Sequence, residues 1–223
     1  MSAVYSAAPR PTHRLVPSQF PPIGLFDTVA TAADLQAVME LEGWTNDRLV
    51  ADRIRRLPQS EWAFGRPNSS IVMAAFLHVA PTGMRFNGPD LGAWYAAAEL
   101  RTAAIEVAHH LRREAAALCL AGLKRRYRAY TSTLDGSYVD IRGQQSTMPA
   151  VYDTRSYGAS QAFGERLRAA GEAGIIFDSL RHAGGINVAA FCPTKILNVI
   201  QTSHYEISVQ SGSSRIDVKQ LTV

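Results

Sequence analysis

An arginine, a tyrosine and a glutamate near the middle of the chain could act together on one charged ligand. Arg85 lies in a turn marked by Gly83 and Gly88. Tyr95 follows in a short apolar segment, and Glu106 lies early in a long Ala- and Leu-rich segment. Arginine suits anions, and a carboxylate suits sugar hydroxyls. We therefore expect the three side chains to converge on one anionic, sugar-containing ligand, although each alone could be a loop charge, a core ring or a solvated acid.

The elements that must position these residues are a strand and a long helix. Trp94, Tyr95 and the alanines after them predict a buried strand, and the segment from about Glu99 to Cys119 predicts a helix. Further strands are expected at 12–16, 71–76, 123–132 (an edge strand), 138–141, 175–177, 187–191 and, as a hairpin, 205–209 with 215–218, and further helices at 31–42, 45–57 and 157–170. Short, scattered strands favour an α+β fold with an antiparallel or mixed sheet.

The composition favours one globular domain that binds an anion. Of the 223 residues, 47% are hydrophobic and 19% charged, which supports a single core. We expect a flexible tail at 1–11 and one domain at 12–223, with a helical insertion at about 31–57. The net charge of +4 and the pI of about 9.3 favour an anionic ligand. No bilayer-spanning run, secretory signal or disulfide framework is visible, so we expect a cytoplasmic protein with two buried thiols.

Several common site motifs are absent from the sequence. It contains neither a G-x-G-x-x-G fingerprint nor a P-loop, and neither H-E-x-x-H nor G-x-S-x-G. His109 and His110 are adjacent, so on a helix they diverge by about 100° and are better explained as helix surface than as a metal pair. The basic run Lys124–Arg128 could contact nucleic acid, but a solvated edge strand protected by charge is the favoured interpretation. No metal is expected, and direct DNA binding is disfavoured.

A series of short motifs in one order resembles the RES-domain toxins, which are named for an arginine, a glutamate and a serine. The motifs are Arg14, Arg85-Phe86-Asn87, Trp94-Tyr95-Ala96-Ala97, Glu106, Gly174-Ile175-Ile176-Phe177-Asp178-Ser179, Gly184-Gly185-Ile186-Asn187 and Phe191-Cys192-Pro193. The resemblance covers about residues 12–195. It departs from the family where Met84 replaces the glycine of a Gly-Arg-Trp-Asn block and Phe86 replaces its tryptophan, and where the segment between Arg14 and Arg85 is long.

The resemblance implies a bacterial toxin of a type II toxin–antitoxin module, paired with an Xre-type helix-turn-helix antitoxin. The implied fold is similar to that of ADP-ribosyltransferases, and the implied activity is cleavage of the nicotinamide–ribose bond of NAD+, as a glycohydrolase or a phosphorylase. The residues implied to contact NAD+ are Arg14, Arg85, Asn87, Tyr95, Glu106, Ser160 and Ser179. Among them the arginines would bind the pyrophosphate, Tyr95 the nicotinamide face and Glu106 the ribose, while Ser179 would position the ribose or the amide.

Several alternatives stay open at this point. The acceptor of the ADP-ribosyl group could be water, inorganic phosphate or a protein side chain, and the last would make the chain a protein mono-ADP-ribosyltransferase. A nucleic-acid-binding module and a non-catalytic interaction protein are the other classes. The segment 24–66 could serve a homodimer or an antitoxin contact.

Overall fold

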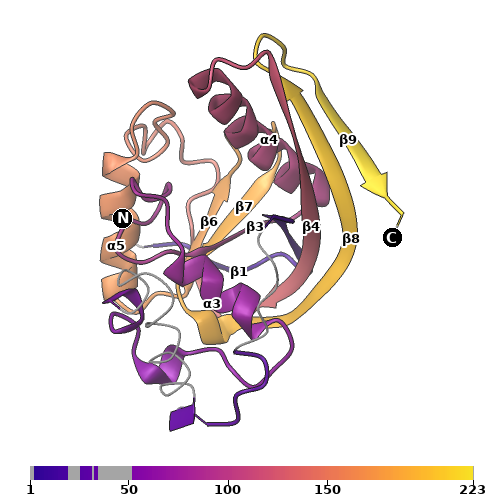
Figure 1. Ribbon diagram of the computed structural model, residues 1–223. Coiled ribbons are helices and arrows are strands. Elements are labelled where there is room, and N and C mark those ends of the chain that lie inside the picture. Colours follow the sequence, from indigo (N-terminus) through magenta and orange to yellow (C-terminus); the bar gives the residue numbers. More distant parts are fainter. Residues whose placement is uncertain (1–2, 20–25, 32, 35–51, 223) are drawn as a thin grey trace.

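The computed structural model describes residues 3–19, 26–31, 33–34 and 52–222, and a nine-stranded sheet lies at the centre of this part of the chain (Figure 1). The strands are β1 Tyr5–Ala7, β2 Thr12–Pro17, β3 Trp94–Ala97, β4 Gly122–Leu134, β5 Ser137–Asp140, β6 Gly174–Asp178, β7 Ile186–Ala190, β8 Ile196–Gln210 and β9 Ile216–Leu221. The helices are α3 Ser69–Leu77, α4 Leu100–Ala117 and α5 Gly158–Ala169, with short 3-10 helices η1 Gln59–Glu61 and η2 Pro193–Lys195.

The strand order is β1-β5-β6-β7-β3-β2-β4-β8-β9. Strands β5 and β6 pair in parallel, and the other neighbouring pairs are antiparallel. The sheet is therefore mixed, and the predicted α+β class is confirmed. In this order β3 lies between β7 and β2, so three segments that are distant in sequence become neighbours at the middle of the sheet.

Helices cover both faces of the sheet, and the alternation of side chains along the strands decides which residues meet which helix. Trp94 and Ala96 of β3 pack in the same apolar cluster as α3, whereas Tyr95 and Ala97 point the other way. That second face is shared by α4, which packs against β2, β4 and β8, and α5, which packs against β6 (Figure 1). The region between α4 and α5 lies over β3 and β7.

Helix α4 follows directly from β3, as predicted from its composition. Its buried stripe contains Ala104, Ala108, Leu111 and Ala115, which recur at helical spacing and pack on β2 and β4. Small alanines let the helix approach the sheet closely. The helix therefore carries Glu106 to a fixed place above the middle strands.

The apolar run 71–76 was predicted as a strand, and this is wrong because it forms α3. Its residues are buried on nearly all sides, with Met73 and Phe76 at 0% exposure, so no helical periodicity is visible. The helix start is held by Asp27, whose two carboxylate oxygens accept the backbone N–H groups of Asn68 (2.9 Å) and Ser70 (2.8 Å). A cap supplied from so far along the chain leaves no local signal.

Three further expectations differ from the structure. Strand β4 is not at an edge but lies between β2 and β8. Residues 5–7 of the expected flexible tail form β1, which pairs with β5. Cys119 is exposed and Cys192 half-buried, rather than both being buried. The helices predicted at 31–42 and 45–57 fall largely outside the described residues.

Candidate active site

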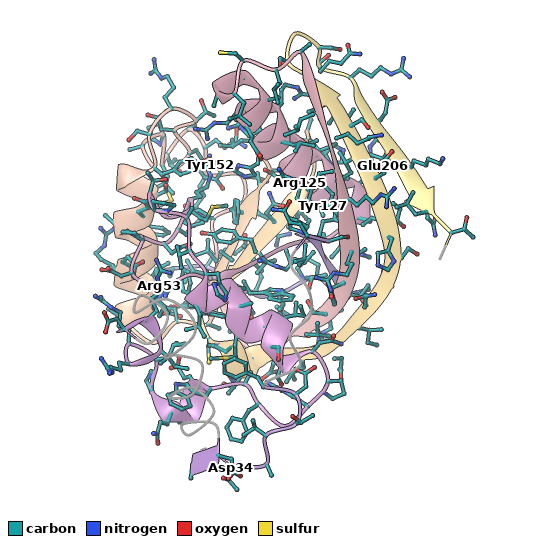
Figure 2. The ribbon with its side chains drawn as sticks, viewed as in Figure 1. Asp34, Arg53, Arg125, Tyr127, Tyr152 and Glu206 are labelled. Atoms are coloured by element: carbon teal, nitrogen blue, oxygen red, sulfur yellow. The ribbon has the colours of Figure 1, made fainter. Side chains whose placement is uncertain are left out.

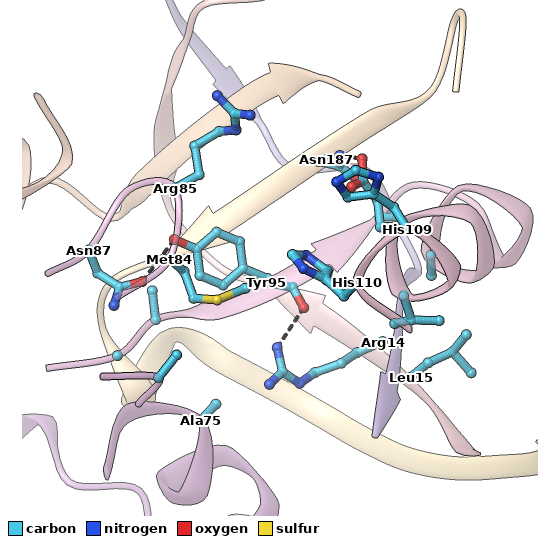
Figure 3. A pocket seen from close by; sticks show the side chains of 18 of the residues that line it. Arg14, Leu15, Ala75, Met84, Arg85, Asn87, Tyr95, His109, His110 and Asn187 are labelled. Carbon is cyan, nitrogen blue, oxygen red and sulfur yellow. Dashed lines mark hydrogen bonds between the residues drawn. The ribbon is translucent and has the colours of Figure 1, made fainter. Parts of the chain in front are cut away.

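A cavity of about 290 Å³ lies at the middle strands and is lined by residues of β2, β3, β7 and α4, and also by Ala75 and His78 from the end of α3 (Figure 3). The charged, polar and aromatic residues of its lining are His13, Arg14, His78, Arg85, Asn87, Tyr95, Glu106, His109, His110, Tyr157, Phe177, Arg181 and Asn187. Five of the seven residues singled out from the sequence are in this lining: Arg14, Arg85, Asn87, Tyr95 and Glu106.

Glu106 of α4 is held by two donors on a single carboxylate oxygen. The Ser179 hydroxyl donates to Oε1 at 2.6 Å, and the Asn187 amide donates to the same atom at 2.8 Å. Both donor residues are 6% exposed, whereas Glu106 is half-buried and lines the cavity. Its second oxygen, Oε2, accepts no hydrogen bond from the described residues. The carboxylate is thus oriented through Oε1, and Oε2 is available to a ligand.

The Ser179 hydroxyl also organises the loop after β6. Its oxygen accepts the backbone N–H groups of Arg181 (3.1 Å) and His182 (2.9 Å) while its proton goes to Glu106. The His182 ring in turn contacts the Thr102 hydroxyl at 2.9 Å. The loop is therefore tied to the first turns of α4 at two points, and this fixes the distance between β6 and Glu106.

Arg14 projects from β2 beneath Tyr95, as Figure 3 shows. Its Nη1 donates to the Tyr95 carbonyl (2.8 Å), and its guanidinium lies 4.7 Å from the centre of the Trp94 ring. Its Nε is buried without a hydrogen-bond partner. Burial lowers the pKa of Arg14 to about 10, so the group remains charged at neutral pH.

Arg85 reaches the cavity from the turn of residues 82–88, which we call the Arg85 turn. Its Nη1 donates to the carbonyls of Val151 (3.2 Å) and Asp153 (3.0 Å), and its guanidinium lies 4.7 Å from the centre of the Tyr157 ring. Burial lowers the pKa of Arg85 as well. The side chain is therefore anchored on one side and faces the cavity on the other.

The Arg85 turn is closed by Tyr95 and Asn87. The Tyr95 hydroxyl donates to Asn87 Oδ1 (2.8 Å) and accepts the Phe86 N–H (2.9 Å), and Asn87 Nδ2 donates to the Gly88 carbonyl (2.8 Å). Burial raises the pKa of Tyr95 well above its ordinary value, so its phenol stays protonated and acts as a donor. Asn87 is 0% exposed and thus supports the turn while also bordering the cavity.

The cavity lining contains more positive than negative charge. None of the ion pairs among the described residues involves Arg14, Arg85 or Arg181, although all three line the cavity. Because a buried cation without a partner is costly, an anionic ligand would relieve this cost. Glu106 is the single carboxylate in the described lining.

The two histidines predicted to lie on the helix surface also border the cavity: His110 is exposed and His109 half-buried. His109 and His110 both line the cavity, three and four residues after Glu106 on α4. Burial, assisted by Arg181, lowers the pKa of His109 to about 4, so this ring is neutral at pH 7. The spacing was the available signal, because helix positions three and four residues apart share a face.

Ser160 is placed differently from the expectation. It is 0% exposed in the first turn of α5, its hydroxyl donates to the Tyr157 carbonyl at 3.0 Å, and it is not part of the cavity lining. Asn187 was noticed in the sequence only as part of a motif, yet its amide is one of the two donors to Glu106. Ser179 does not line the cavity itself and reaches it through Glu106.

The basic run on β4 is balanced by acids. Arg125 donates to both carboxylate oxygens of Glu114 (2.8 and 2.6 Å), and Lys124 and Arg126 each lie 3.7 Å from Glu206. Figure 2 shows Arg125 on β4 and Glu206 on the neighbouring β8. This pairing fits a solvated strand face better than a nucleic-acid surface.

The described part of the chain has neither a metal-ligand cluster nor a membrane-spanning helix. There, no group of three or more His, Cys, Asp or Glu side chains is arranged to hold a metal ion. Within the same residues, no helix has both the length and the apolar character needed to cross a membrane.

Comparison with known proteins gives a family model and a likeness among solved structures. The family model described as "RES domain" matches residues 52–210, more than half of the chain. The chain is also similar to a structure from M. tuberculosis titled "Crystal structure of the M.tuberculosis MbcT-MbcA toxin-antitoxin complex", with 17% identity, a TM-score of 0.40, and coverage of 55% of this chain and 73% of that one. The comparison with curated proteins gave no match.

Proposed function

Because the chain belongs to the RES domain family, we propose that it is the NAD+-degrading toxin of a type II toxin–antitoxin module. The observation that carries the proposal is the setting of Glu106. This carboxylate is oriented by Ser179 and Asn187 and lies in a cavity with Arg14 and Arg85, which have no acidic partner among the described residues. An oriented acid beside uncompensated cations suits a ligand with an anionic part and a sugar.

The binding roles follow from charge and shape. Arg14 and Arg85 would bind the pyrophosphate, since guanidinium groups make paired, charge-assisted hydrogen bonds to phosphate oxygens. The Tyr95 ring would lie against the nicotinamide, and its hydroxyl is already engaged with Asn87. Glu106 Oε2 would then meet the ribose.

In the chemical step, the bond between the nicotinamide nitrogen and the ribose breaks, and its electron pair goes to that nitrogen. This neutralises the cationic ring, so no strong general acid is needed. Positive charge develops on the ribose, as in glycoside cleavage, and the Glu106 carboxylate stabilises it. The oxygen of water or inorganic phosphate then bonds to the ribose and its proton is released to solvent, which gives ADP-ribose or its 1″-phosphate.

The proposal includes a partner. An enzyme that consumes NAD+ would harm the bacterium that makes it. We therefore expect an antitoxin, of the Xre type in this family, to block the cavity. Co-expression of such a partner should restore growth to cells that express the chain.

The test is proton NMR of the purified chain with NAD+, with and without phosphate. We expect free nicotinamide to appear, and a requirement for phosphate would identify a phosphorylase. Replacement Glu106→Gln should lower kcat/KM by about 10²- to 10³-fold, the usual effect of removing one electrostatic stabiliser. The matched control is Glu114→Gln, on the same helix but paired with Arg125. An unchanged NAD+ spectrum would refute the proposal, and a mass increase on a co-incubated protein would instead indicate protein ADP-ribosylation.

A further inference from the structure

Arg85 receives its support from one short segment, residues 151–157. The carbonyls of Val151 and Asp153 accept hydrogen bonds from Arg85 Nη1, and the centre of the Tyr157 ring lies 4.7 Å from the guanidinium carbon. The remaining nitrogens, Nε and Nη2, make no hydrogen bond within the described residues. The two carbonyls hold one corner of the guanidinium, and the ring lies beside its central carbon.

Tyr157 is itself held at the start of α5. Its carbonyl accepts the Ser160 hydroxyl (3.0 Å) and the Gln161 backbone N–H (2.8 Å). Ser160 is fully buried, so this contact is protected from water. Ser160 thus acts on the site through Tyr157 and not by direct contact with a ligand.

The same face of α5 holds the backbone of the Arg85 turn. The Gln161 amide donates to the carbonyls of Thr82 (2.8 Å) and Met84 (3.0 Å), and Glu165 accepts the N–H of Gly88 (2.9 Å). These residues follow Tyr157 at helical spacing, so one face of the helix controls both the turn and its arginine.

The third contact on this face is a close backbone approach. A Cβ added at Gly164 would lie 2.1 Å from the Phe86 carbonyl oxygen. Only glycine therefore permits α5 to pack this tightly against the Arg85 turn. With the backbone so constrained, the ring of Tyr157 and the two carbonyls together determine where the guanidinium points.

We propose that Tyr157 is a positioning residue for the reaction, whose ring holds the Arg85 guanidinium toward the pyrophosphate of the dinucleotide. The ligand class rests on the proposed function. A ring held against a partly desolvated guanidinium favours one orientation of the cation. Loss of the ring should therefore weaken substrate binding with little change in the chemical step.

The first measurement uses the protein without ligand. In nitrogen–proton NMR of arginine side chains, the Arg85 Nε–Hε signal is assigned by its disappearance in Arg85→Lys. We expect ring-current shielding of this signal in the wild type and in Tyr157→Phe, and its movement toward exposed-arginine positions in Tyr157→Leu. Ser160→Ala keeps the Tyr157 ring but removes the hydrogen bond to its carbonyl, so it should move the signal in the same direction. This variant provides the test if Tyr157→Leu does not fold.

The second measurement is nicotinamide release. Tyr157→Leu should raise KM for NAD+ about three- to tenfold, the effect of losing one cation–π contact, with kcat within about twofold, and Tyr157→Phe should restore KM. The matched control is Phe163→Leu, which removes another ring beside an arginine of α5, at 5.8 Å from Arg166, outside the cavity lining.

The outcomes separate the two proposals. An Arg85 signal that stays in place in both Tyr157→Leu and Ser160→Ala overturns the positioning role, whatever the activity. A signal that moves while the wild type releases no nicotinamide supports the positioning role and removes the proposed function. An equal rise of KM in the Phe163 control also overturns the inference, because the effect would then be a general one of α5.

Discussion

Removal of the two side chains that donate to Glu106 should reduce catalysis although Glu106 itself is unchanged. We consider Asn187→Ala and Ser179→Ala, which delete the donors at 2.8 and 2.6 Å from Oε1. Either change frees the carboxylate to rotate and to bind water. The expected result is a lower kcat, since stabilisation of the ribosyl cation depends on a preoriented charge.

The magnitude follows from the kind of bond that is lost. A hydrogen bond to a charged group contributes about 1.5–3 kcal/mol, which corresponds to about a 10- to 150-fold change in rate if the whole contribution acts in the transition state. Asn187→Ala isolates this effect, since among the described residues its amide donates to Glu106 alone. Ser179→Ala also deprives two backbone N–H groups of an acceptor, so it should lower the melting temperature more.

The assay is nicotinamide release by single and double variants, repeated in a Glu106→Gln background. If both donors act through Glu106, their effects should be less than additive and should nearly vanish in that background. The control is Ser213→Ala in the β8–β9 turn, where the hydroxyl likewise accepts an N–H two residues ahead, at 3.1 Å. A double variant within twofold of the wild type would contradict this reasoning, as would a full Asn187→Ala effect in the Gln background.

Further outcomes concern packing, pH and ligand binding. Gly164→Ala should displace the Arg85 turn, destabilise the fold by about 1–3 kcal/mol and reduce activity. Gly158→Ala on the same helix should do neither, because its added Cβ would lie 3.7 Å from the nearest atom, Ser156 Oγ. Arg142 lowers the pKa of Asp140 from 3.8 to about 2, so Asp140→Asn should lower the melting temperature above pH 4, and the difference should fade as pH falls toward 2. ADP-ribose at 100 times its Kd should raise the unfolding free energy of the wild type by about 2.7 kcal/mol, as measured by calorimetry. Arg14→Met should lose this ligand-dependent stabilisation while keeping the stability of the ligand-free protein.

The parts of the fold that the sequence predicts correctly are those where local preference and tertiary setting agree. Helix α4 is rich in good helix formers with a regular apolar stripe, and β3 and the β8–β9 hairpin have apolar or alternating patterns next to turn residues. Helix α3 was assigned wrongly because burial on all sides removes periodicity and its cap comes from Asp27. The edge position assigned to β4 was wrong because strand order depends on long-range pairing.

For the site, the sequence predicts the side chains that face the cavity better than those that support them. Arg85, Tyr95 and Glu106 carry chemistry that stands out by residue type. The supporting residues have no such mark: Asn187 is a polar residue in an apolar strand, and Tyr157 is an aromatic residue beside a helix start. Their roles depend on contacts between elements that are distant in sequence.

The sheet order explains why these residues meet at all. Strands β7, β3 and β2 are neighbours, so Asn187, Tyr95 and Arg14 reach one cavity from three distant segments. Helix α4 returns over the same strands because it begins directly after β3. The cost of closing a longer loop rises only slowly with its length. The spatial order of the residues therefore defines this site better than their spacing along the chain.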